Sequence, residues 1–230
     1  KELELLHCYI AILLKKINYA DLKNIETNLN GTSFEYKNEK YNLQLVGEHQ
    51  ARNATLAIEC ANDLKINNIG KGLERAFYPA RMEVISINPT IIIDGAHNED
   101  KLQALLRFLT PKTYNSKPNK KYLIFALAKN KQVTKVLPQL LEFFDVTYLT
   151  RFSNPFRKVM NYSDWLTKFA KSDKNKLYYK HYAKDALVEI LPKLKKDDLL
   201  VITGSIFLAG ELREHWCSEE EIVKNRKSIF

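Results

Sequence analysis

The stretch TIIIDGAHNED, residues Thr90 to Asp100, decides the fold class. Three isoleucines run directly into Asp94, Gly95 and His97, and the two acids that follow are typical of the first turn of a helix. A continuous apolar run of this length indicates a strand covered on both faces, as in a parallel sheet. Ligands of such sheets bind at the carboxyl ends of the strands, so an acid, a glycine and a histidine at this point suggest a binding site.

The chain after Pro79 repeats the alternation of apolar strand and amphipathic helix, which predicts a parallel sheet covered by helices on both faces. The further strands are expected near residues 121–127, 146–150, 177–180 and 198–204, and the helices that follow them near 133–144, 164–171, 185–194 and 207–216. Ser163 is expected to cap the 164–171 helix. The motifs DGAHN and TGS both lie where a strand ends.

The chain before Pro79 follows a different pattern. Residues 1–25 are predicted to be largely helical, and TSFEY and YNLQLVG read as two strands of a hairpin around Lys37-Asn38-Glu39-Lys40. Residues 50–65 have helical spacing of apolar side chains. Pro79 interrupts the pattern and marks the expected boundary between two folding units.

The composition indicates a soluble globular protein, with 45% hydrophobic residues and 27 acidic ones among 230. The longest apolar stretch, residues 5–14, is much shorter than the roughly 20 residues that cross a bilayer, so no membrane association is expected. Three widely separated cysteines suggest neither a disulfide framework nor a zinc site. We therefore expect a cytoplasmic protein with reduced thiols.

The net charge of +9 raises the hypothesis of nucleic-acid binding. The lysines are scattered and mixed with acids, and no zinc finger, RNP-type aromatic motif or basic-region helix occurs, so we expect no nucleic-acid partner. An anionic small molecule would suit the charge equally well.

Each motif also has a plain structural explanation. An ordinary strand-to-helix turn explains Gly95 and a capping Asn98 in DGAHN, but not Asp94 or His97. GEHQARNATLAIECA can be a helix with a polar first turn, and RMEV can hold a surface ion pair between its arginine and its glutamate. In TGSIFLAGELR, Ser205 can cap a helix, or the free N–H groups there can bind an anion.

In their order and spacing, GEHQARNATLAI, RMEVI, IIIDGAHN and VITGSIFLAGELR resemble the folylpolyglutamate synthase/dihydrofolate synthase family of Mur-type ligases, over about residues 32–213. The HQ pair and the closing GSIFLAG helix resemble the folate branch more than the peptidoglycan ligases. The resemblance implies an α/β fold. Residues 1–78 would be the tail of the central ATP-binding α/β domain, and residues 79–230 a Rossmann-like C-terminal Mur ligase domain with a mostly parallel sheet.

The resemblance implies roles for individual residues. Asn53 would contact adenine, and Arg81 and Asp94 would hold ATP from the other side. His97 would lie near the phosphates as a catalytic residue. Ser205 is also expected to take part in binding the nucleotide, because its place ahead of a helix suits an anion.

The loop that carries Asp-Lys-Asp in the family reads Asn130-Lys131-Gln132 here, so both flanking acids of that signature are missing. Lys131 would still neutralise a phosphate or a substrate carboxylate, as a second catalytic residue. The proline that usually follows DGAHN is Glu99.

The implied reaction is ATP- and Mg²⁺-dependent addition of L-glutamate to folate or dihydrofolate through an acyl phosphate. No Gly-x-x-x-x-Gly-Lys-Ser/Thr pattern occurs in the sequence. We therefore expect the C-terminal portion of a monomeric ligase, inactive alone, with the phosphate loop and the Mg²⁺ ligands outside it and no metal site within it. One alternative is a non-catalytic nucleotide-binding or interaction module. Another is a Mur-type ligase for a different amino acid, which the HQ and GSIFLAGELR motifs disfavour.

Overall fold

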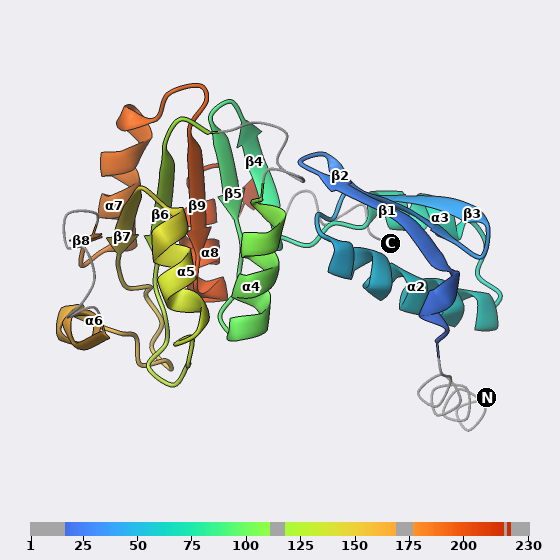
Figure 1. The fold of residues 1–230 in the computed structure, drawn as a ribbon, viewed down its shortest axis with the longest axis horizontal. Helices are drawn as coiled ribbons and strands as arrows, with labels where there is room; N and C mark the ends of the chain where they lie inside the picture. The colour runs from blue at the N-terminus through green and yellow to red at the C-terminus, as the bar shows by residue number, and fades with distance from the viewer. Residues whose placement is uncertain (1–16, 111–117, 169–176, 219, 222–230) are drawn as a thin grey trace. The chain divides into compact units, whose positions relative to one another are not determined.

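The computed structural model describes residues 17–110, 118–168, 177–218 and 220–221. The chain divides into two compact units, Lys1–Phe77 and Tyr78–Phe230, which we call the amino-terminal and the carboxyl-terminal unit (Figure 1). The division lies one residue from the boundary expected at residues 78 and 79. The assignment of the amino-terminal unit to an ATP-binding domain stays a prediction.

The amino-terminal unit contains an antiparallel three-stranded sheet and helices packed against it. The sheet has the order β1 (Leu22–Asn28), β2 (Gly31–Tyr36) and β3 (Glu39–Leu43). The other elements are η1 (Tyr19–Asp21), α2 (Glu48–Asp63) and α3 (Ile69–Arg75). The expected hairpin is confirmed, with a tighter turn, because Lys37 and Asn38 both have positive φ and Glu39 already belongs to β3.

The prediction of a helix up to residue 25 is wrong at its end, and residues 1–16 lie outside the described part. Leu22 to Ile25 belong to β1, which pairs with β2. An irregularity between Lys23 and Glu26 lets Leu22 and Ile25 both pack against the core of the unit. Apolar residues three positions apart on one face are typical of a helix, whereas a regular strand places every second residue on one face. The bulge gives this strand the apolar spacing of a helix, which explains the wrong prediction.

The carboxyl-terminal unit is built on a six-stranded sheet in the order β4-β5-β9-β6-β7-β8. All neighbouring strands are parallel except β4, which is antiparallel to β5, so the predicted mostly parallel α/β fold is confirmed. The strands are β4 (Glu83–Ile87), β5 (Thr90–Ile93), β6 (Lys121–Phe125), β7 (Val146–Leu149), β8 (Leu177–Tyr179) and β9 (Leu199–Thr203).

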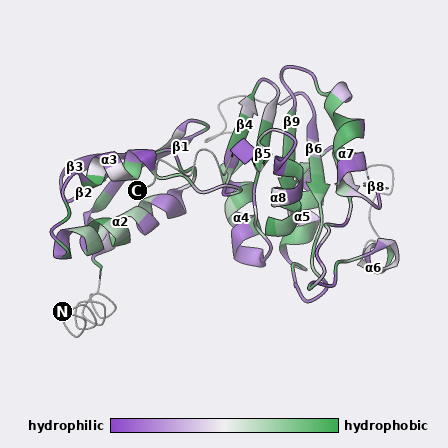
Figure 2. Cartoon of the chain, turned by 180° about the vertical axis from the view of Figure 1, so that it is seen from behind, coloured by the Kyte–Doolittle hydropathy of each residue, from purple (hydrophilic) through white to green (hydrophobic). Residues whose placement is uncertain are grey.

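Helices cover both faces of this sheet, α4 and α5 on one and α7 and α8 on the other (Figures 1 and 2). The helices are α4 (Glu99–Phe108), α5 (Val136–Phe143), α6 (Tyr162–Lys168), α7 (Ala183–Ile190) with η3 (Leu191–Lys193), and α8 (Ile206–Arg213). Every residue of β5 and β9 is buried, and hydrophobic colour is concentrated in the central strands in Figure 2. This explains why these strands are continuously apolar instead of alternating.

Two details of the helices differ from expectation. Helix α5 begins at Val136 rather than at residue 133, which puts Pro138 in the first turn, where its missing N–H costs no helical bond. The cap of α6 is Asn161, not Ser163: its side chain accepts from the Asp164 N–H (3.0 Å), and the Asp164 carboxylate accepts from the Asn161 N–H (2.8 Å).

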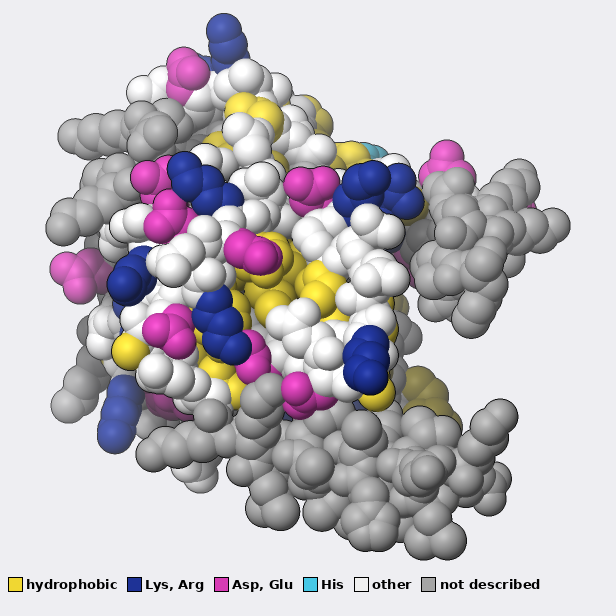
Figure 3. Space-filling model, turned by 90° about the vertical axis from the view of Figure 1, so that its right-hand side faces the viewer, with side chains coloured by type: hydrophobic (Ala, Val, Ile, Leu, Met, Phe, Trp, Pro, Cys, Tyr) yellow, Lys and Arg dark blue, Asp and Glu magenta, His cyan; other side chains and the backbone are white. Residues whose placement is uncertain are grey.

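The surface view in Figure 3 shows Lys and Arg side chains interspersed with Asp and Glu around a small hydrophobic area. None of the helices in the described ranges has the length and apolar character needed to cross a bilayer. Cys60 and Cys217 are free thiols, and Cys8 lies outside the described residues. A cytoplasmic location and a monomeric state stay predictions.

Candidate functional site

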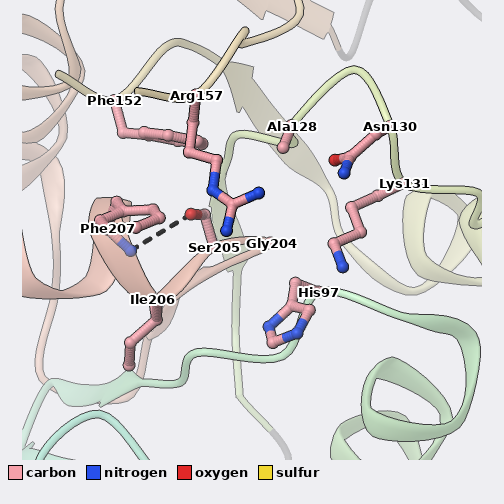
Figure 4. Close-up of a pocket in the computed structure, with 10 residues that line it drawn as sticks. All are labelled: His97, Ala128, Asn130, Lys131, Phe152, Arg157, Gly204, Ser205, Ile206 and Phe207. Atoms are coloured by element: carbon pink, nitrogen blue, oxygen red, sulfur yellow. Dashed lines mark hydrogen bonds between the residues drawn. The ribbon is translucent and has the colours of Figure 1, made fainter. Parts of the chain in front are cut away.

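A pocket of about 230 Å³ lies at the carboxyl edge of the large sheet (Figure 4). Each of the parallel strands β5, β6, β7 and β9 contributes the segment that follows its carboxyl end, as expected for a ligand site in this kind of sheet. The lining residues are His97 after β5, Ala128, Asn130 and Lys131 after β6, Phe152 and Arg157 after β7, and Gly204, Ser205, Ile206 and Phe207 after β9.

His97 is held by its own turn. Its Nδ1 lies 2.8 Å from the carbonyl oxygen of Gly95, and because a carbonyl only accepts, Nδ1 carries the proton of this bond. The Nε2 atom is then the ring nitrogen left for a ligand. In Figure 4, the Lys131 ammonium and the Arg157 guanidinium extend into the space next to this ring. The structure therefore brings the two predicted catalytic residues, His97 and Lys131, to one pocket.

The turn between β9 and α8 forms the floor of the pocket. Gly204 has φ +103°, and its N–H donates to the Ala96 carbonyl at 2.9 Å. A Cβ at this position would lie 2.3 Å from the Ala126 carbonyl oxygen, so glycine is required. Ser205 caps α8, because its hydroxyl oxygen accepts the Phe207 N–H at 3.2 Å, which confirms the predicted cap. The role of Ser205 in nucleotide binding stays a prediction.

Arg157 is a pocket residue that the sequence pattern did not single out. The chain after β7 returns to the loop after β6, where the Lys129 N–H donates to the Lys158 carbonyl at 2.9 Å. This bond sets Arg157 next to the loop that carries Lys131. In the sequence, Arg157 is one of many scattered basic residues, and its only distinguishing feature is its place in the loop after an apolar strand. The packing of that loop against the loop after β6 is what makes Arg157 a pocket residue.

An aromatic pair closes one side of the pocket. Phe152 is 3% exposed and stacks on Phe207, with ring centroids 5.5 Å apart and planes at 28°. The pocket thus combines two cationic side chains and a histidine with an apolar wall. This combination suits a small anion that carries an organic group.

Asp94 lies behind the turn and does not line the pocket. Its side chain is buried, and one carboxylate oxygen accepts the Met82 N–H at 2.8 Å while the other accepts the Ala96 N–H at 2.9 Å. Burial raises the pKa of Asp94 above its usual value, although the two N–H bonds and the charge of Arg81 act in the opposite direction. Each oxygen keeps a second lone pair that can accept a further hydrogen bond. The role of Asp94 in holding ATP stays a prediction.

Arg81 is exposed on a tightly held segment. Its neighbours Ala80 and Met82 are buried and both have positive φ, of 56° and 45°, and its guanidinium lies over the Tyr78 ring at 4.9 Å from the centroid. The expected alternative of a surface ion pair between Arg81 and Glu83 is wrong.

Glu83 instead accepts from Nε of Arg213 at 2.8 and 2.9 Å and from the Ala80 N–H at 2.8 Å. Both side chains of this ion pair are almost buried, with 8% of Glu83 and 11% of Arg213 exposed. The pair ties β4 to α8 within the carboxyl-terminal unit.

Asn53 lies in the amino-terminal unit, exposed on α2, where its side-chain amide donates to the Gln50 Oε1 at 3.1 Å. Its predicted contact with adenine stays a prediction. Within the described residues, no group of three or more His, Cys, Asp or Glu side chains is arranged to hold a metal ion.

Comparison with known proteins adds the family. The family model described as "Dihydrofolate synthetase, C-terminal domain" matches residues 81–215, more than half of the chain. The dihydrofolate synthase/folylpolyglutamate synthase of Bacillus subtilis is 24% identical over 197 residues, which cover 80% of this chain and 44% of that protein. The folylpolyglutamate synthase of Lacticaseibacillus casei is 31% identical over 178 residues, 74% of this chain and 39% of that protein.

A solved structure shares the fold. The Mycobacterium tuberculosis folylpolyglutamate synthase complexed with ADP superposes with a TM-score of 0.71 at 22% identity, covering 85% of this chain and 47% of that one. The chain thus spans less than half the length of these relatives. The matched model, the shared fold and the four ordered motifs agree, and the chain belongs to the dihydrofolate synthetase/folylpolyglutamate synthase family of ligases.

Proposed function

We propose that this chain is the carboxyl-terminal part of an ATP-dependent ligase that joins L-glutamate to a folate or dihydrofolate through an amide bond. The observation that carries the proposal is the pocket in which His97, Lys131 and Arg157 meet the start of α8. Two cationic side chains and the N-terminus of α8 lie at one sheet edge, and together they favour an anionic ligand. Family membership supplies the class of reaction.

Lys131 and Arg157 are proposed to neutralise the negative charge of the reacting groups, which are carboxylate and phosphate oxygens. Arg157 can hold two oxygens of one carboxylate with its planar fork, whereas Lys131 acts as a compact point charge. His97, with Nδ1 fixed by the Gly95 carbonyl, offers Nε2 to a phosphate oxygen. In this arrangement the cations lower the barrier by stabilising charge that develops during the transfer.

ATP, bound as a substrate together with Mg²⁺, supplies the phosphoryl group that activates the folate carboxylate as an acyl phosphate. The amine of glutamate then attacks the activated carbonyl carbon, and phosphate leaves. We propose that Asn53, Arg81, Asp94 and Ser205 hold the nucleotide. The apolar wall of the pocket would keep water from the acyl phosphate.

The test is the steady-state kinetics of the full-length protein with Lys131→Met. Loss of a charge-assisted hydrogen bond is expected to raise the KM for glutamate or folate roughly ten- to a hundredfold. The matched control is Lys135→Met, an exposed lysine in the same loop that does not line the pocket. Unchanged KM values for both substrates in Lys131→Met would contradict the assignment of the pocket.

The alternative of a non-catalytic module is supported by one observation, the loop Asn130-Lys131-Gln132, which lacks the two acids of the Asp-Lys-Asp signature. Glutamate-dependent formation of ADP by the full-length protein decides between the two. Nucleotide binding without any glutamate-dependent turnover would favour the module.

A further inference from the structure

Glu99 caps a helix to which it does not belong. It is the first residue of α4, two positions after His97, and its carboxylate accepts the N–H groups of Lys135 and Val136, both at 2.9 Å. These two groups lie at the start of α5, whose own N-cap residue, Lys135, provides no side-chain cap. A carboxylate at a helix N-terminus satisfies free N–H groups and is favoured by the helix dipole.

The loop held by this cap is the one that carries Lys131. It runs from the end of β6 to Val136, and its beginning is fixed by main-chain bonds from Lys129 to the Lys158 carbonyl (2.9 Å) and from Lys131 to the Ala128 carbonyl (3.0 Å). Val133, in the middle of the loop, is fully buried. Glu99 fixes the far end, so Lys131 lies between two anchored points.

We infer that Glu99 is a positioning residue that sets Lys131 against His97 in the pocket, an inference that rests on the proposed function. His97 and Glu99 lie on one continuous turn into α4, so the two bonds from Glu99 transmit the position of that turn to the loop of Lys131. Both carboxylate oxygens of Glu99 accept main-chain N–H groups, so the side chain holds the backbone of the loop and not one of its side chains.

The contact itself is tested in this chain by amide hydrogen exchange. In Glu99→Ala the amides of Lys135 and Val136 should exchange faster, and in Glu99→Gln, which keeps one acceptor oxygen, the increase should be smaller. The matched control is Asp100→Ala, which removes the exposed neighbouring acid of the same turn and should leave both amides unchanged. Unaltered exchange in Glu99→Ala would overturn the inference.

The action through Lys131 is tested by a double-mutant cycle in the full-length protein. Glu99→Ala should raise the KM for glutamate or folate by roughly tenfold or more, because small displacements of a binding group cost up to about a hundredfold. In a Lys131→Ala background the same change should add less than about twofold. A merely structural effect of Glu99 would instead multiply with that of Lys131→Ala.

The outcomes separate the two proposals. A large effect of Lys131→Ala, with an undiminished effect of Glu99→Ala on top of it, would overturn the positioning role of Glu99 and leave the proposed function standing. Unchanged KM values in Lys131→Ala would overturn both.

Discussion

Replacement of Asp94 by alanine should destabilise the carboxyl-terminal unit even in the absence of any ligand. The carboxylate is buried and accepts the N–H groups of Met82 and Ala96, which themselves belong to residues only 4% and 3% exposed. Each buried N–H left without a partner costs about 1–3 kcal/mol. Burial raises the pKa of Asp94, which means that burying the ionised carboxylate costs free energy. Removal of the carboxylate in Asp94→Ala relieves this cost and so offsets part of the destabilisation.

We therefore expect Asp94→Ala to lower the free energy of unfolding by about 2–4 kcal/mol. Asp94→Asn keeps one acceptor oxygen for one of the two N–H groups and should lose roughly half as much. The assay is urea unfolding of this chain followed by tryptophan fluorescence. Trp165 and Trp216 are its two tryptophans and both lie in the carboxyl-terminal unit, so the signal reports that unit.

The reasoning would be refuted if the free energy of unfolding of Asp94→Ala lay within about 0.5 kcal/mol of the value for the unaltered chain, because changes of that size are typical of surface positions. It would mean that the N–H groups of residues 82 and 96 find other partners. If Asp94→Ala leaves the free energy of unfolding unaltered but weakens nucleotide binding by the full-length protein, the effect on binding comes from contact with the ligand and not from the turn.

Two further predictions use the same unfolding assay. Gly204→Ala should lower the free energy of unfolding by at least about 3 kcal/mol, because Gly204 has positive φ and the new Cβ would approach the Ala126 carbonyl. The matched control is Gly210→Ala, which should be neutral or stabilising because its Cβ meets nothing within 4 Å. Equal stabilities of the two variants would contradict the prediction. Glu189 has its pKa lowered from 4.5 to about 2, chiefly by the hydrogen bond from Lys180, so its contribution to stability is present above pH 4.5 and is lost as the pH falls through 2. The difference between the unaltered chain and Glu189→Gln should therefore shrink between pH 4.5 and 2, and a constant difference would exclude the effect.

The sequence by itself determined the elements whose signal is local. The apolar runs of β5, β6 and β9 identify a covered parallel sheet, because buried strands lack the alternation of exposed ones. Lys37-Asn38-Glu39-Lys40 identifies the place of the hairpin turn, and the segments after β5 and β9 identify the edge at which the pocket lies. His97 and Ser205 were found in this way, whereas Lys131 was found only through the family resemblance.

The tertiary structure decided what depends on partners far apart in the sequence. The place of β9 between β5 and β6 brings four loops to one pocket, and no local pattern encodes that order. Arg157 becomes a pocket residue only because its loop pairs with the loop after β6, and Asp94 is buried only because residue 82 folds back onto it. Glu99 looks like an ordinary first-turn acid in the sequence, yet its carboxylate bonds to N–H groups 36 and 37 residues away. Hydrogen bonds of this kind form when the packing of a sheet brings distant segments together, and side-chain periodicity along one segment carries no information about them.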